Sequence, residues 1–355
     1  MPGLNFNSQS IRVVQHNSAG DFLSVAYPTL RRHERSSNII LAHALKRIST
    51  EAALTGCQFI TDSEVYPNSP STSQNYDDSF WLTVWSTSAT GSAPTLDLIL
   101  SCTTNTLGDY PVFLWTPYTS SSKSATWLVP RITALIHHLL TRVHPERVFS
   151  VFGLTSLVKT FAKHWSDITG FVVEPEPFYA AYFTFCTPDT FQESAYQLSK
   201  GHVLRRATLA DVDSVAQLCK EFADDSIYFP LTIDRAKVEA CEMISKGQIW
   251  VYEASNDIAA ICAVTRSSVD VSAITKVYTT PKWRRRGFAE HLVRYVTRRL
   301  FDCGKESVVL YVGHANSAQR VYDRVGFVGL CGKSKPEGVE DSLELGFVGS
   351  KRGHW

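Results

Sequence analysis

The sequence predicts an α/β fold in two tandem domains, each a mixed, mostly antiparallel sheet flanked by helices. The chain has 355 residues, more than one hydrophobic core usually organises. Both halves follow the order strand, helix, helix, three strands, helix, strand, helix, strand. In each half a Gly-Phe pair, Gly170-Phe171 or Gly326-Phe327, ends the last helix. We therefore expect one domain at residues 1–195 and a second at 201–355.

Hydrophobic periodicity places the elements of the first half in order. A Ser-, Pro-, Asn- and Asp-rich segment, 61–79, predicts a loop, and the serine-rich segment 119–125 predicts a flexible connection. Strands are expected at 12–15, 80–87, 96–104, 111–117, 147–153 and 178–186, and helices at 21–35, 37–53, 128–143 and 156–169.

The second half repeats this order. An Asn-Asp turn between two apolar runs indicates a hairpin, and Gly304 marks the end of a helix. Strands are expected at 202–207, 249–254, 258–267, 271–279, 307–312 and 342–348, and helices at 208–222, 233–246, 289–303 and 317–325.

Composition excludes several classes of protein. Hydrophobic residues make up 44% of the chain, enough for packed cores, and no apolar run approaches the ~20 residues that span a membrane. A net charge of +1 argues against a nucleic-acid partner. The first 20 residues lack a secretory pattern and the eight cysteines form no Cys-x-x-Cys pair, so we expect reduced cysteines and a cytoplasmic location. The pair His137-His138 lacks neighbouring ligands, so no metal is expected.

One stretch, Ile274 to Ala289, carries the strongest chemical signal. A β-branched run ends at Pro281, a basic turn with Arg284, Arg285, Arg286 and Gly287 follows, and an amphipathic helix begins. A helix N-terminus binds a diphosphate because its unpaired amides and its dipole both face the anion. Gly287 allows close approach because it has no Cβ. The pattern therefore predicts a diphosphate site.

Two motifs together resemble the GCN5-related N-acetyltransferase (GNAT) superfamily. Arg284 to Ala289 fit Arg-x-x-Gly-x-Ala, the family's acetyl-CoA signature. The segment from Asn316 through Tyr322 to Gly326-Phe327 is similar to the family's Asn-x-x-Ala-x-x-x-Tyr-x-x-x-Gly-Phe helix, with the alanine one position early. The resemblance covers roughly residues 203–348.

The resemblance implies where acetyl-CoA binds. The strand that ends at Thr279 is expected to separate from the strand that begins near Ser307, and pantetheine would enter between them. A backbone donor there would stabilise the oxyanion that forms during transfer, by about 2.7–4 kcal/mol in comparable sites. The implied acetyl-CoA contacts are Val277, Tyr278, Thr279, Arg284, Arg285, Arg286, Gly287, Phe288, Ala289, Asn316 and Arg320.

The resemblance also assigns Tyr322 as the general acid that protonates the departing thiolate. A phenol with a pKa near 10 suits this task, although a tyrosine on a helix is often only part of the core. The general base stays open: His314, Glu253 and a water relay are alternatives. Glu221, Asp224 and Asp225 are candidates for attracting a cationic acceptor, or they form an ordinary solvated loop.

The first half departs from both motifs. Its corresponding turn, residues 118–126, has no glycine and only Lys123 as a cation, and the tyrosine position falls at Ser166 or Trp165. We therefore expect a degenerate GNAT-like domain that does not bind CoA and helps shape the acceptor cleft.

These expectations combine into one function. The protein is expected to be an N-acetyltransferase that moves an acetyl group from acetyl-CoA to the amine of a small molecule or amino-acid-like metabolite. The amine would attack directly in a ternary complex, with CoA as product and the enzyme a monomer or homodimer. The alternatives are a CoA-binding sensor or scaffold without turnover, and transfer of another acyl group or to a hydroxyl.

Overall fold

The computed structural model describes residues 10–55, 79–87, 93–105, 107–119, 124–194, 197–225 and 228–354. The predicted loop at 61–79 lies outside these ranges except for Ser79, as do residues 120–123 of the predicted flexible connection. The predicted strands and helices are all present, with ends that shift by a few residues.

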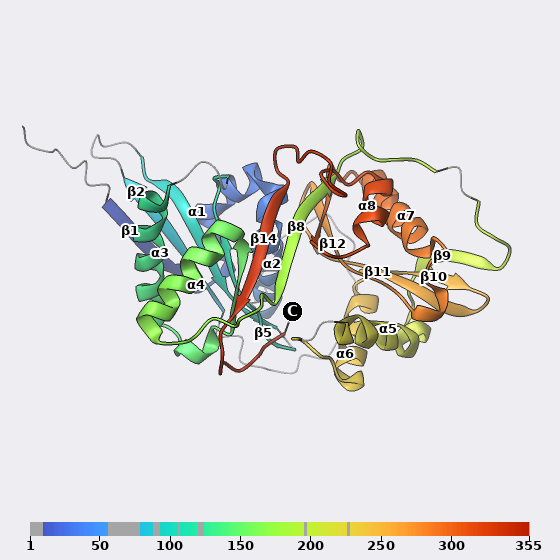
Figure 1. The fold of residues 1–355 in the computed structure, drawn as a ribbon, viewed down its shortest axis with the longest axis horizontal. Helices are drawn as coiled ribbons and strands as arrows, with labels where there is room; N and C mark the ends of the chain where they lie inside the picture. The colour runs from blue at the N-terminus through green and yellow to red at the C-terminus, as the bar shows by residue number, and fades with distance from the viewer. Residues whose placement is uncertain are drawn as a thin grey trace, which may run out of the picture.

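A twelve-stranded sheet runs through the whole molecule in the order β1-β2-β3-β6-β7-β14-β8-β13-β12-β11-β10-β9 (Figure 1). The strands before residue 190 are β1 (Ser10–His16), β2 (Phe80–Thr87), β3 (Thr95–Cys102), β6 (Val112–Trp115), β7 (Ser150–Leu154) and β8 (Tyr179–Cys186). The later strands are β9 (His202–Arg206), β10 (Ile249–Ala254), β11 (Asp257–Ser267), β12 (Val271–Thr279), β13 (Ser307–Gly313) and β14 (Glu340–Gly346). Two short strands, β4 (Thr104–Asn105) and β5 (Gly108–Asp109), form a separate hairpin.

Helices cover both faces of this sheet, because each has one apolar side that needs a sheet to pack on. The first half has α1 (Ala19–Arg32) and α2 (Glu34–Thr55) on one face, and α3 (Ala125–Leu140) and α4 (Thr155–Thr169) on the other. The second half has α5 (Val212–Asp224) and α6 (Ile233–Ser245) on one face, and α7 (Phe288–Asp302) and α8 (Gln319–Val325) on the other. The two halves therefore repeat one architecture.

The last strands of the two halves are exchanged. The final strand of the first half, β8, pairs with β13 of the second half. The final strand of the second half, β14, pairs with β7 of the first half and with β8. Figure 1 shows β14 and β8 side by side at the centre of the molecule. The exchange joins both halves into one sheet, and the sequence pattern did not predict it.

A buried carboxylate also ties the halves together. Glu34, at the start of α2, is 5% exposed. Its Oε1 accepts hydrogen bonds from the amides of Asp270 (2.8 Å) and Val271 (3.2 Å), at the turn between β11 and β12. Arg31 forms ion pairs with both Glu34 and Asp270. The helix α2 is therefore anchored at the start of β12, the strand that carries the predicted site.

Two further findings bear on the expectations from composition. Within the described ranges, no helix combines the length and the apolar character that crossing a membrane requires. The cysteines of these ranges are all free.

We predict that Leu343→Ala in β14 lowers the free energy of unfolding by about 2–5 kcal/mol, the range for large-to-small changes in a core. Leu343 is 7% exposed and packs in the core of the first half, although it comes from the end of the chain. Urea unfolding followed by tryptophan fluorescence measures the change. Val348→Ala, at a side chain that is 47% exposed, is the control and should shift stability by less than about 0.5 kcal/mol. Equal stability of the two variants would contradict a structural role for the exchanged strand.

Candidate active site

The parallel strands β12 and β13 pair only at their beginnings. The pairing runs from Val271 with Ser307 to Ala273 with Val309 and then stops. A β-bulge at Thr275 follows, since Ile274 pairs with Val264 on β11 and Lys276 pairs with Ala263. Beyond Ala273 the two strands diverge, as the family resemblance implied. We call the gap between residues 274–279 and 310–313 the β12–β13 opening.

Backbone groups of two predicted residues face this opening. In an antiparallel ladder, hydrogen-bonded pairs alternate with pairs whose N–H and C=O groups point outward. The amide of Thr280 donates to the carbonyl of Ala259 at 3.1 Å, and the register from there to Val277 is regular. Val277 and Thr279 therefore point their backbone groups away from β11 and toward the opening. The side chain of Tyr278 packs in the core that α5 and α6 cover, so it lies on the face of the sheet away from α7 and α8.

The turn that follows β12, which we call the arginine turn (residues 280–287), has the backbone of an anion site. Arg285 has a φ of 61° and Gly287 a φ of 80°, so two residues take left-handed conformations within one short turn. Among the described residues, no partner is found for the amides of residues 285–290. These amides and the N-terminus of α7 fit a diphosphate. A Cβ on Gly287 would lie 3.1 Å from His291 Nε2, so the space above the turn is already narrow.

The three arginines of the turn differ in their contacts. The Arg284 guanidinium donates from Nε to the carbonyl of Thr279 (3.0 Å) and from Nη2 to the Tyr278 hydroxyl (3.0 Å). It therefore fastens the turn to β12, a contact that its predicted phosphate role does not include. Arg286 lies over the Trp283 ring at 4.7 Å, and Arg285 is exposed. The side chains of Arg285 and Arg286 are the ones free to meet an anion.

Phe288 and Ala289 can contribute to the predicted diphosphate site only through their backbone amides. The Phe288 side chain is 5% exposed and stacks on Tyr252 with ring centroids 4.2 Å apart. Only its amide can contact a ligand. The helix α7 is thus fixed to the sheet by the ring next to its predicted anion-binding amides.

Tyr322 lies on α8 and is 7% exposed, within the core that α7 and α8 share. Burial, with smaller contributions from Cys262 and Tyr179, raises the pKa of its hydroxyl far above the ordinary value. The phenol therefore stays protonated at neutral pH. The Tyr322 ring packs against the Phe327 ring with centroids 5.8 Å apart, and this contact fixes its orientation.

The helix α8 begins at Gln319, two residues later than predicted. Asn316 Oδ1 accepts from the Ala318 amide (2.9 Å), whereas the Gln319 side chain donates to the carbonyls of Gly313 and His314. Asn316 and Gln319 therefore do not form a capping box. Asn316 and Arg320 are both exposed at this end of the helix.

The two base candidates are held by other side chains. His314 follows β13, and its Nε2 lies 3.2 Å from Asp341 Oδ1. Glu253, on β10, accepts from Arg205 Nε (2.9 Å) and Nη2 (2.7 Å). Since β10 lies two strands from β12, about 4.8 Å per strand, Glu253 is also remote from the opening. The structure does not bring either residue together with Tyr322.

The acidic candidates lie at the end of α5. Asp225 is 3.5 Å from Arg284, and Asp224 pairs with Lys220. Glu221 accepts from Gln217 (3.0 Å) and lines a shallow hollow together with Lys282 and Trp283. This hollow is on the outer side of the arginine turn. Of the three carboxylates, Asp225 contacts the turn, Glu221 lines a hollow beside it, and Asp224 is paired within α5.

Sequence reasoning missed a cluster on the opposite face of the sheet. It contains Arg266 of β11, Tyr311 of β13 and Tyr179 of β8, with His43 and Tyr110 from the first half. An arginine at the end of a strand gives no signal in the sequence. Only the fold places it beside the opening.

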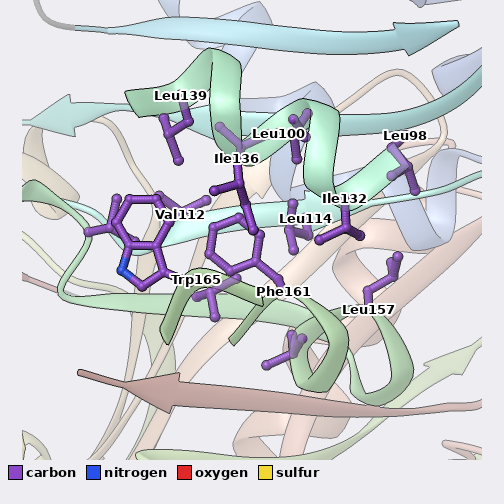
Figure 2. Packing of buried hydrophobic residues seen from close by; sticks show 14 of the residues in the cluster. Leu98, Leu100, Val112, Leu114, Ile132, Ile136, Leu139, Leu157, Phe161 and Trp165 are labelled. Carbon is purple, nitrogen blue, oxygen red and sulfur yellow. The ribbon is translucent and has the colours of Figure 1, made fainter. Parts of the chain in front are cut away.

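The corresponding strands of the first half, β6 and β7, pair from Val112 with Val151 to Phe113 with Phe152. A Cβ on Gly153 of β7 would lie 2.5 Å from the Leu114 carbonyl of β6, so these strands are still in close contact one residue beyond that pairing. Trp165, at the position of Tyr322, is fully buried and stacks on Phe161. Figure 2 shows both rings packed between α3 and the strands.

No group of three or more His, Cys, Asp or Glu that could hold a metal is found in the part of the chain that the structure describes.

Comparisons with known proteins follow the same division of the chain. The model of the acetyltransferase (GNAT) family matches residues 213–327. A comparison with curated proteins gives no match. A solved Drosophila protein aligns at 11% identity over 95% of this chain and 99% of its own, with a TM-score of 0.59.

Two bacterial structures align over less of the chain. A GCN5-related N-acetyltransferase from Sphaerobacter thermophilus has 17% identity over 76% of this chain and 81% of its own (TM-score 0.47). One from Kribbella flavida has 15% identity over 71% of this chain and 87% of its own (TM-score 0.45).

The Drosophila likeness extends the fold over both halves, whereas the family match lies in the second half alone. The matched residues contain the arginine turn, the β12–β13 opening and Tyr322. Residues 213–327 therefore form a domain that matches the acetyltransferase (GNAT) family.

Proposed function

We propose that the protein is an acetyl-CoA-dependent N-acetyltransferase acting on the amine of a small molecule or amino-acid-like metabolite. One observation carries this proposal: the β12–β13 opening, edged by outward backbone groups of Val277 and Thr279, leads directly to the arginine turn. When bound, acetyl-CoA supplies the acetyl group as an activated thioester.

The protein's own groups divide the binding between them. The amides of residues 285–290 and the dipole of α7 hold the diphosphate, and the side chains of Arg285 and Arg286 add charge. The outward backbone groups of Val277 and the amide of Thr279 orient the thioester arm, since the Thr279 carbonyl already accepts from Arg284 Nε. A backbone amide there stabilises negative charge on the acetyl oxygen as it develops.

Direct transfer to the amine is favoured by the state of Cys262, a cysteine that acts electrostatically on Tyr322. Cys262 is completely buried, and burial raises the pKa of its thiol strongly. A thiol is a weak nucleophile compared with its thiolate, so Cys262 does not offer a covalent route. Tyr322 holds the proton that the departing thiolate needs.

The amine must lose a proton before it attacks. His314 lies beside Asp341 and Glu253 is bound by Arg205, so a water relay to solvent is the simplest route. We place the enzyme in the cytoplasm, as a monomer or homodimer, without a metal, a nucleic-acid or a membrane partner. An assay of thiol release with a panel of amines tests the reaction, and no release with any amine would count against it.

A CoA-binding protein without turnover is the second candidate, because the strongly raised pKa of Tyr322 makes the phenol a weaker acid. The two candidates differ in what Tyr322 does.

We predict that Gly287→Val weakens CoA binding at least tenfold, because the new side chain fills the narrow space in front of the free amides. Isothermal titration calorimetry with CoA measures the effect. Gly304→Val is the matched control: its φ is 82°, close to the 80° of Gly287, but a Cβ there meets nothing within 4 Å. Both variants carry similar backbone strain, so an equal loss of CoA affinity would show that strain alone is responsible.

We predict that Tyr322→Phe lowers kcat by about 10²–10⁴-fold and leaves CoA affinity within a few-fold of wild type, the range expected for loss of a general acid. Steady-state thiol release and calorimetry together measure both quantities. Tyr295→Phe, another hydroxyl removed from a tyrosine packed against the same core, is the control. If Tyr322→Phe keeps wild-type kcat, the acid role is wrong.

A further inference from the structure

Arg266 is a buried cation without a partner. Its residue is 7% exposed, and its Nε has no hydrogen-bond acceptor. Among the described residues no carboxylate or carbonyl is paired with its guanidinium, and its nearest recorded contact is the Tyr311 ring, 5.9 Å from Cζ. An unpaired buried charge is strongly unfavourable, by several kcal/mol in typical proteins. A bound anion would relieve this energy.

The groups around Arg266 are uncharged at neutral pH. Burial raises the pKa of Tyr110 and of Tyr311 to about 12, and it raises the pKa of Tyr179 as well. Burial and the nearby Arg266 lower the pKa of His43 to about 3. The phenols therefore remain hydrogen-bond donors, and Arg266 supplies the charge of the cluster.

The carboxylates of this region are engaged elsewhere. Glu344 accepts a hydrogen bond from the Ser150 hydroxyl at 2.7 Å, and its charge contributes to the raised pKa of Tyr179. Glu239 is held by Lys276, with both oxygens within 2.8 Å of Nζ. Neither forms a recorded ion pair with Arg266.

Solvent reaches this cluster although both halves surround it. His43, Tyr110, Tyr179 and Tyr311 are each partly exposed. His43 and Tyr110 come from the first half, with their rings stacked 5.0 Å apart, and Tyr311 comes from the second. The side chains around Arg266 therefore come from both halves and keep a partial contact with solvent.

The position of Arg266 relates the cluster to the β12–β13 opening. Arg266 pairs with Ala273 on β12, and Ala273 is the last residue of β12 that pairs with β13. The guanidinium extends toward Tyr311, two residues beyond the end of that pairing. Ala273, Val309 and Tyr311 pack together on the face away from α7 and α8. The positive charge of Arg266 thus lies at the end of the β12–β13 opening where the strands still pair, on the face of the sheet opposite α7.

We infer that Arg266, with the hydroxyls of Tyr110, Tyr179 and Tyr311, binds the carboxylate of the acceptor, so that the acceptor is an amine that also carries a carboxylate. This inference rests on the proposed function and narrows its acceptor class. A planar guanidinium matches a carboxylate in a two-pronged contact. One cation balances a single negative charge, which favours a carboxylate over a phosphate dianion. In an α-amino acid one carbon separates the amine from the carboxylate, so a carboxylate bound at Arg266 keeps the amine close to this end of the β12–β13 opening.

The test compares amino acids with the amines that lack their carboxylate: alanine with ethylamine, and phenylalanine with 2-phenylethylamine. With acetyl-CoA, the wild-type enzyme should favour the amino acid by on the order of 100-fold in kcat/KM, the scale of lost hydrogen bonds to a charged group. Arg266→Gln should remove this preference by lowering kcat/KM with the amino acids toward the value with the plain amines. Arg266→Lys, which keeps the charge without the planar fork, should retain part of it.

Arg299→Gln, at an arginine whose side chain is 58% exposed, is the control and should keep the preference. Arg266→Gln should not lower the melting temperature, since no ion pair is lost. Equal kcat/KM for both members of each pair would overturn the inference. A preference for amino acids that survives in Arg266→Gln would also overturn it. The same holds if Arg266→Gln lowers kcat/KM only when succinyl-CoA replaces acetyl-CoA, because Arg266 would then bind the acyl donor and not the acceptor.

Binding without turnover separates this inference from the proposed function. In a thermal-shift measurement without any coenzyme, alanine, phenylalanine and sodium acetate should raise the melting temperature of the wild type and not that of Arg266→Gln. This result with no thiol release would support the subsite and contradict the transferase. Thiol release without an Arg266-dependent change in melting temperature and without a preference for amino acids would support the transferase and contradict the subsite.

Discussion

The divergence of β12 from β13 is the constraint on which the rest of the structure depends. Separating two strands in mid-sheet leaves backbone groups unpaired, which is unfavourable unless other partners exist. The other edge of β13 is paired with β8 from Val308 to Gly313, the whole length over which β12 has moved away. β12 likewise stays paired with β11 to Thr279. Each strand of the opening is therefore supported from its outer side, and β8 comes from the first half.

The exchange of strands explains why the first half persists without the motif of the second. It supplies β8 to one side of the opening and anchors β12 through Glu34. Its own β6 and β7 are in close contact at Gly153, and Trp165 fills its core. The first half therefore works as a support for the second. Its fold is repeated, but the chemistry of the turn is not.

Local sequence signals predicted the parts of the site that depend on local geometry. The arginine turn, Gly287 and the helix that follows are specified by neighbouring residues, and the structure places them as expected. Strand exchange depends on which distant strand each edge meets, and period-2 patterns do not encode a partner. The predicted phosphate contact of Arg284 leaves out its hydrogen bond to Tyr278, because this contact forms only when β12 and the turn fold together. Arg266 was missed for the same reason.

The two charged regions lie on opposite faces of the sheet, and this separates two kinds of selectivity. The arginine turn sits within the residues that the family model matches, as does Arg266 itself. Tyr110, Tyr179 and His43 lie outside them, on elements of the first half. Changes there would alter the surroundings of Arg266 without touching the turn. If the proposed roles hold, the coenzyme is selected by a local motif and the acceptor by contacts between the halves. The family motif then specifies the reaction, while the acceptor can change through substitutions in the half that carries no motif.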